Sequence, residues 1–122
     1  MPAPLFAAVL AAALLLLAGG CSERLDPTPP PGPERGRQLL TQYHCGTCHT
    51  IPGVAGARGT LAVTLQGIGA RSYLAGQIPH DEEALVQWIV DPASLVPHTA
   101  MPRMGVSPED ARDIAAYLRS LR

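Results

Sequence analysis

The sequence has 122 residues, enough for one small domain, and its nine basic residues, all arginine, nearly balance ten acidic ones. A nucleic-acid-binding protein needs a basic face, so this balance argues against that class. Aromatic side chains are few (one Trp, three Tyr and one Phe), and a small domain with so thin a core often needs a metal, a disulfide or a cofactor.

The chain opens on an apolar segment. Residues 5–17 are almost entirely Leu, Ala and Val, and the small residues Ala18, Gly19 and Gly20 follow. This pattern is typical of a secretory signal peptide with its cleavage zone, and it is too short for a comfortable membrane span. The first four residues carry no Lys or Arg, so an uncleaved anchor stays as an alternative. We expect residues 1–20 to be a signal peptide and the protein to be exported.

Cys21 comes directly after the small residues. The sequence LAGGC resembles the lipobox of bacterial lipoproteins, in which the cysteine is acylated and becomes the mature N-terminus, although the usual leucine is Ala18 here. A free thiol is a liability in an oxidising compartment, and the other two cysteines have a different role, described below. We therefore predict lipid attachment at Cys21, with an incidental cysteine as the alternative.

A proline-rich stretch follows. Residues 22–33 read SERLDPTPPPGP, and five prolines in twelve residues leave neither helix nor sheet. Together with the anchor cysteine, residues 21–33 form a tether that spans up to about 35 Å. The folded domain is expected at residues 34–122.

The domain is expected to begin with a helix over residues 34–43, where Leu39, Leu40 and Tyr43 share one apolar face. Residues 50–77 are rich in glycine and lack a helical period, so they are expected to be mostly loop.

Two more helices follow in the sequence. Asp81 is a plausible N-cap for the first, and Asp91-Pro92 ends it. Residues 94–105 contain two prolines and are expected to be irregular. Ser107 caps the terminal helix, whose buried stripe should be Ala111, Ile114, Ala115, Leu118 and Leu121. No alternating strand pattern of useful length is present, so the sequence predicts an all-α fold.

The segment CGTCH at residues 45–49 carries the chemistry. The pattern C-x-x-C-H is the attachment signature of c-type haem. On a helical turn Cys45, Cys48 and His49 lie on one face. Two thiols there can add to the two vinyl groups at one haem edge, with the imidazole directed at the iron. We predict one covalent haem c on Cys45 and Cys48, with His49 as proximal iron ligand.

Other uses of this motif fit less well. A thioredoxin-like redox pair needs a surrounding βαβ pattern, which is absent. A zinc site needs two further ligands at close spacing, whereas His80 and His98 are eighteen residues apart. A structural disulfide between the two cysteines is possible, but it leaves His49 unexplained.

The second axial ligand must come from farther along the chain. The candidates are Met101, Met104, His98, His80 and His44. Met101 lies in a loop where Pro102 fixes the backbone, which gives a Met there a reason beyond filling a core. We predict Met101 as the distal iron ligand, with His98 as its rival. His/Met ligation fills both axial sites and suits electron transfer.

In order and spacing these motifs resemble the class I (mitochondrial-type) cytochrome c family over residues 34–122. Besides the haem motif, the resemblance rests on Gly36 and Tyr43 at the family's helix crossing, Thr99-Ala100-Met101-Pro102 as its distal Met-Pro loop, and Tyr117 in its terminal helix. The resemblance implies a class I cytochrome c fold, with about three main helices wrapped around one covalently bound haem that exposes one edge.

Three further positions qualify this resemblance. The segment from Trp88 to Pro92 is similar to the tryptophan helix of cytochromes associated with oxidases and dehydrogenases. The family often has Gly-Pro before a Leu, with the Pro carbonyl accepting from the proximal histidine; here Ala62-Val63 precedes Thr64-Leu65, so His49 is expected to be less rigidly held. Leu40 replaces the usual aromatic at the end of the first helix.

The function expected from these features is single-electron transfer between membrane-associated redox proteins on the periplasmic side of a bacterial membrane. Docking should use an apolar patch around the exposed haem edge, because the balanced charge gives weak steering. No small-molecule substrate is expected. The alternatives are a haem peroxidase or gas-binding protein with an open sixth site, against which Met101 argues, and a fixed haem subunit of a dehydrogenase or oxidase.

Overall fold

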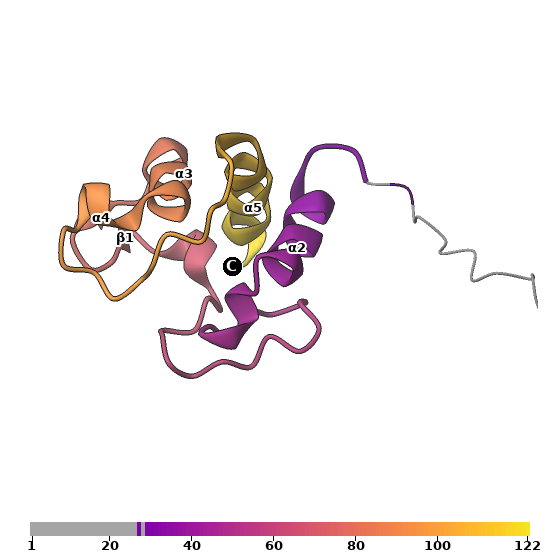
Figure 1. The fold of residues 1–122 in the computed structure, drawn as a ribbon, viewed down its shortest axis with the longest axis horizontal. Helices are drawn as coiled ribbons and strands as arrows, with labels where there is room; N and C mark the ends of the chain where they lie inside the picture. The colour runs from indigo at the N-terminus through magenta and orange to yellow at the C-terminus, as the bar shows by residue number, and fades with distance from the viewer. Residues whose placement is uncertain (1–26, 28) are drawn as a thin grey trace, which may run out of the picture.

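The computed structural model describes residues 27 and 29–122, so the predicted signal peptide and Cys21 lie outside the described residues. Helices dominate the described part, as Figure 1 shows. In chain order the elements are α2 (Pro33–Gln42), η1 (Cys45–Thr47), η2 (Ile68–Ala70), β1 (Tyr73–Leu74), β2 (Ile78–Pro79), α3 (Glu82–Val90), α4 (Pro92–Leu95) and α5 (Pro108–Ser120).

The helices α2 and α5, the first and last of the described part, cross in contact (Figure 1). The crossing point is Gly36, where an added Cβ would lie 1.9 Å from the carbonyl oxygen of Asp113. Only glycine lets the two backbones approach this closely. Leu40 and Ile114 are both buried beside the crossing, so Leu40 fills the position of the family's aromatic. α2 begins at Pro33, one residue before the predicted start, because proline suits the first turn of a helix.

The caps predicted for the other two main helices are confirmed. The carboxylate of Asp81 accepts from the N–H of Ala84 (2.7 Å) at the start of α3. The hydroxyl of Ser107 accepts from the N–H of Asp110 (3.1 Å) at the start of α5. The predicted stripe of α5 is buried except for Leu121, which is half-buried just beyond the helix.

The segment after α3 is more regular than expected. Instead of remaining irregular from residue 94, the chain forms the one-turn helix α4, which starts at Pro92. The carbonyl of Asp91 accepts from both the N–H (3.1 Å) and the hydroxyl (2.7 Å) of Ser94, and these bonds close the turn. Proline at the first position presets the backbone for it.

A small antiparallel hairpin accompanies the helices of the predicted all-α fold. In it, β1 and β2 pair Tyr73 with Pro79 and Leu74 with Ile78. Each strand has two residues, too few to show an alternating pattern, so neither strand could be recognised from the sequence. The turn between them contains Ala75 and Gly76, both with positive φ.

A single apolar core joins these elements. Its buried members come from all the main helices and from the long loop between η1 and α3. Leu40, Leu85 and Ile114 are among its most completely buried side chains. Within the described residues, no helix is long and apolar enough to cross a membrane.

Candidate functional site

The haem motif forms a tight turn directly after α2. His44, in the left-handed region at φ 56°, redirects the chain into η1. The carbonyl of Cys45 then accepts from the N–H of Cys48 (3.3 Å) and from that of His49 (3.0 Å). These two bonds confirm the helical turn that the spacing predicted. The turn therefore brings together the three side chains predicted to hold the haem.

Both thiols of the motif are free and half-buried. Burial raises the pKa of the Cys45 thiol, which keeps it neutral. The turn itself is pressed against the following loop: a Cβ at Gly46, between the two cysteines, would lie 2.6 Å from the Cα of Ala57. This contact leaves no room for a side chain at Gly46. The turn that carries both cysteines therefore packs directly against the loop at Ala57.

The ring of His49 is oriented by the backbone. Its Nδ1 lies 2.7 Å from the carbonyl oxygen of Val63, and because a carbonyl only accepts, Nδ1 is assigned the hydrogen. Nε2 is then the nitrogen available to a metal. The carbonyl is held in place because the N–H of Ala62 donates to Cys48 O (2.9 Å) and the N–H of Leu65 donates to Thr50 O (2.9 Å). The Val63 carbonyl thus accepts the hydrogen bond that a proline carbonyl accepts in the family. Hydrogen bonds of the residues on both sides of Val63 hold this carbonyl in place.

Large apolar side chains are exposed on the same loop. Leu61 is 83% exposed and Val63 is 67% exposed. A covalent haem needs two thiols for attachment, an imidazole for the iron and an apolar surface. The turn supplies the two free thiols and the imidazole with its Nε2 available, and the adjoining loop supplies the exposed apolar groups. The residues present therefore fit the predicted cofactor.

The candidates for the distal ligand are spread over the fold. Met101 is half-buried in the loop from α4 to α5, where its N–H donates to the Thr99 hydroxyl (3.2 Å), whereas Met104 is exposed. His98 and His44 are also exposed, and His80 has its Nδ1 engaged by a backbone carbonyl. The loop that carries Met101 is separate from the haem-motif turn, and ligation by Met101 stays a prediction.

The profile of the cytochrome c family matches residues 33–122. The chain belongs to the cytochrome c family. This membership confirms the predicted class I fold and a covalently bound haem c, and Cys45 and Cys48 fit the family's attachment motif. Proteins of this family carry electrons on that haem.

Two curated relatives differ in size from one another. Cytochrome c oxidase subunit 2 of Alkalihalophilus pseudofirmus is 36% identical over 89 residues, which cover 72% of this chain and 25% of that protein. The chain therefore spans about a quarter of that relative's length. Cytochrome c2 iso-2 of Magnetospirillum molischianum is 26% identical over 88 residues, 64% of this chain and 91% of the relative.

A solved structure shows the same fold. Cytochrome c2 from Rhodobacter sphaeroides superposes with a TM-score of 0.56 at 23% identity, covering 75% of this chain and 97% of that one. At this identity the likeness concerns the fold alone.

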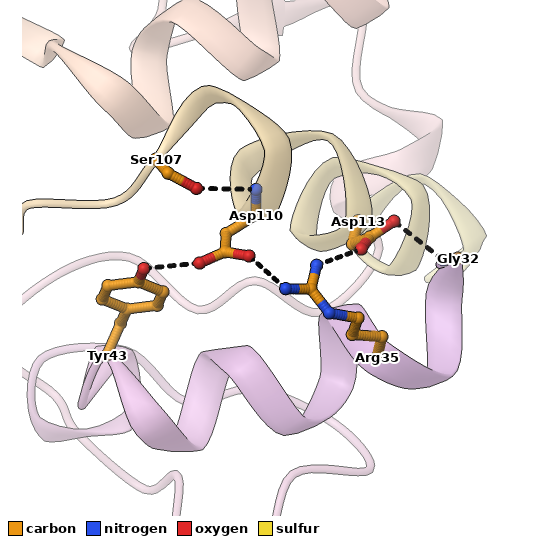
Figure 2. Close-up of polar contacts among 6 residues, drawn as sticks. All are labelled: Gly32, Arg35, Tyr43, Ser107, Asp110 and Asp113. Carbon is orange, nitrogen blue, oxygen red and sulfur yellow. Dashed lines mark hydrogen bonds and ion pairs between the residues drawn. The ribbon is translucent and has the colours of Figure 1, made fainter. Parts of the chain in front are cut away.

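One polar cluster of the cytochrome was not foreseen from the sequence (Figure 2). The guanidinium of Arg35 on α2 donates to Asp110 and to Asp113 on α5, at 2.5 Å each. The Tyr43 hydroxyl donates to Asp110 (2.6 Å), and the N–H of Gly32 donates to Asp113 (2.7 Å). We call Arg35, Tyr43, Asp110 and Asp113 the α2–α5 clamp. The available signal was Asp113, an acid next to Ile114 in the buried stripe of the terminal helix.

Hydrogen bonds inside the clamp shift the pKa values of Asp110 and Tyr43. The hydrogen bond from Tyr43, followed by that from Arg35, lowers the pKa of Asp110 below its usual value. The same bond raises the pKa of Tyr43, because losing the phenolic proton would place two negative charges together. The clamp is built from the ionised carboxylate and the protonated phenol, and both persist at neutral pH.

A second tyrosine fixes the loop that follows the haem motif. The Tyr117 hydroxyl on α5 donates to the carbonyl of Pro52 (2.8 Å). The terminal helix of the cytochrome therefore supports both α2, through the clamp, and the loop that begins just after His49.

Proposed function

We propose that this cytochrome passes single electrons between redox proteins at the periplasmic face of a bacterial membrane, where a lipid on Cys21 holds it. The observation that carries the proposal is the orientation of His49. Its Nδ1 is fixed on the Val63 carbonyl, so Nε2 has one set direction before any partner arrives. A ligand that does not move between oxidation states keeps the reorganisation on electron transfer small.

Met101 is proposed to complete the iron site. Haem c supplies the one-electron couple, and a thioether opposite an imidazole favours a high potential. The half-buried position of Met101, its N–H bond to Thr99 and the following Pro102 restrict its backbone. A sixth ligand from the chain excludes small molecules from the iron, which supports a carrier over a peroxidase or a gas-binding protein.

The partners are proposed to be membrane-bound redox complexes. The chain is similar to one part of a protein named as an oxidase subunit, and Trp88 lies in α3 at the place of the tryptophan helix. This similarity also favours a second candidate, in which the chain is a fixed subunit of an oxidase or dehydrogenase. A free shuttle held by its tether instead relies on a raised local concentration.

The experiment is oxidation of the reduced, full-length, lipid-bearing protein by membranes that contain a terminal oxidase. We expect rapid one-electron oxidation and no reaction of the ferrous protein with carbon monoxide. Ready binding of carbon monoxide would overturn the carrier proposal in favour of the gas-binding or peroxidase alternative. Stoichiometric co-purification with a complex after mild detergent extraction would identify the fixed subunit, whereas a shuttle separates from its partners.

A further inference from the structure

The loop between α4 and α5, which carries Met101, has few polar contacts with the rest of the fold. Before the methionine, the N–H of Thr99 donates to the carbonyl of Val96 (3.0 Å), and the N–H of Met101 donates to the Thr99 hydroxyl (3.2 Å). Both bonds lie within the segment from Val96 to Met101. They shape the loop on that side of the methionine, but they join it to no other element.

After the methionine, an ion pair joins the loop to a distant part of the chain. The Nε of Arg103 lies 3.5 Å from Oδ1 of Asp91, the residue between α3 and α4. Within the described part of the chain, no other hydrogen bond or ion pair connects residues 100–106 with another element. The loop is otherwise anchored through an apolar side chain, that of Val106, which is buried just before α5.

Asp91 is held in place by its own backbone. Its N–H donates to the carbonyl of Gln87 (2.8 Å) at the end of α3, and its carbonyl accepts from the N–H (3.1 Å) and the hydroxyl (2.7 Å) of Ser94. The next residue, Pro92, is among the most completely buried of the fold. The Asp91 carboxylate is therefore attached to a fixed corner between two helices.

Helix capping does not occupy this carboxylate. An aspartate that precedes a helix commonly accepts from a backbone N–H of the first turn, as Asp81 does for α3. Asp91 stands in the same position before α4, but its side chain makes no such bond. Its contact is instead with Arg103, which follows Met101 by two residues.

We propose that the ion pair between Arg103 and Asp91 is a latch that keeps Met101 in its ligand position. It restrains the loop on the side of the methionine where no other polar contact does so. At 3.5 Å the pair is too long for a strong hydrogen bond, so it acts through charge and dissolved salt weakens it. Arg103 is a positioning residue, because it affects the iron site only through the loop. The latch rests on the proposed ligation by Met101 and does not depend on the lipid or on a redox partner.

Imidazole is the probe for an open loop, because it binds ferric haem iron in place of a displaced methionine. Added to the ferric holoprotein at fixed pH, it replaces a sulfur–iron bond by a nitrogen–iron bond without electron transfer, and the weak long-wavelength absorption is lost. Exposed ion pairs contribute modestly, so we expect Arg103→Gln to raise the imidazole affinity about two- to five-fold at low salt. Added salt should raise the wild-type affinity towards that of the variant, whose own affinity should stay constant.

A double-mutant cycle distinguishes the latch from a general loosening of the loop. Asp91→Asn should match Arg103→Gln, and the two changes together should have the effect of one, because each removes the same pair. Arg103→Lys keeps the charge and should restore part of the wild-type behaviour. Arg112→Gln, at an exposed arginine of α5, is the matched control and should bind imidazole as the wild type does.

The outcomes separate the latch from the ligand assignment. Wild-type imidazole affinity in a folded, haem-loaded Arg103→Gln protein would overturn the latch, and so would independent, additive effects of Arg103→Gln and Asp91→Asn. In both cases the sulfur–iron band of the wild type would keep Met101 as the ligand. Absence of that band from the wild type would overturn the ligation by Met101 and the latch together.

Discussion

Met101 and Met104 lie close together in the loop between α4 and α5, but their surroundings differ. Met101 is half-buried and its backbone is tied to the Thr99 side chain, whereas the Met104 side chain is 39% exposed. A ligand must be held over the iron, and an exposed side chain loses more rotamer freedom when it is held. This difference separates the two methionines more clearly than their sequence context does.

Met101→Ala is therefore expected to remove the sixth iron ligand. The ferric protein should lose the weak long-wavelength absorption of a sulfur–iron bond, its potential should fall, and the ferrous protein should bind carbon monoxide. Met104→Ala serves as the control and should keep all three wild-type properties. If the wild type itself lacks the band but remains six-coordinate and low-spin, His98 is the ligand.

Asp110 is the carboxylate through which the clamp depends on pH. Because its pKa is lower in the folded state, the stability it contributes is complete above the unfolded value of about 4 and is lost as the pH falls through the folded one. Asp110→Asn should lower the urea midpoint at pH 7, and the difference from wild type should shrink below pH 4. Glu109→Gln, at an exposed acid of the same turn, is the control. A pH-independent deficit in Asp110→Asn would contradict this account.

At the scale of elements, the crossing of α2 and α5 is set by Gly36. Gly36→Ala would place a methyl group on the Asp113 carbonyl oxygen, so the two helices must separate and strain the clamp. We expect a loss of about 1–3 kcal/mol or more in the free energy of unfolding, measured by denaturant titration of the holoprotein. Gln38→Ala, exposed on the same helix, should change it little. Equal stability of the two variants would show that the crossing tolerates a side chain.

The helices and the haem turn were predictable because their signals are local. Asp81 and Ser107 each reach a backbone N–H three residues away, and the spacing of Cys45 and His49 fixes a single turn. The clamp was not predictable, because Arg35 and Asp113 are 78 residues apart in the chain and meet only in the folded protein. The buried Nε2 of His80, which has no hydrogen-bond partner among the described residues, is likewise visible only in three dimensions.

At the scale of the whole molecule, a covalent haem supplies the apolar mass that a core with few aromatics lacks. Thioethers on Cys45 and Cys48 should keep the haem with the polypeptide through acid–organic extraction and denaturing electrophoresis, after expression with the haem-ligation machinery. The double variant Cys45→Ala/Cys48→Ala should give a colourless chain. A colourless wild type would refute covalent attachment.

Lipidation of Cys21 is a separate prediction about where the molecule resides. Intact mass spectrometry of membrane-extracted protein should show a chain that starts at Cys21 and carries acyl mass. The Cys21→Ala variant should give no acylated chain. A soluble product that starts at Ser22 or later would contradict lipidation and leave the cytochrome intact. Retention of residues 1–20 would instead identify an uncleaved anchor.

The bond from the Gly32 N–H to Asp113 has a mechanical consequence for a tethered protein. A pull on the chain before Gly32 first loads that bond and the ion pairs of Arg35. These contacts transmit the load to α5. The haem turn follows the opposite end of α2 (Figure 1), so this load enters the domain away from it. If the proposed tether holds the chain at a membrane, a pull through it therefore loads the contact between α2 and α5 in shear before it reaches the turn that carries His49.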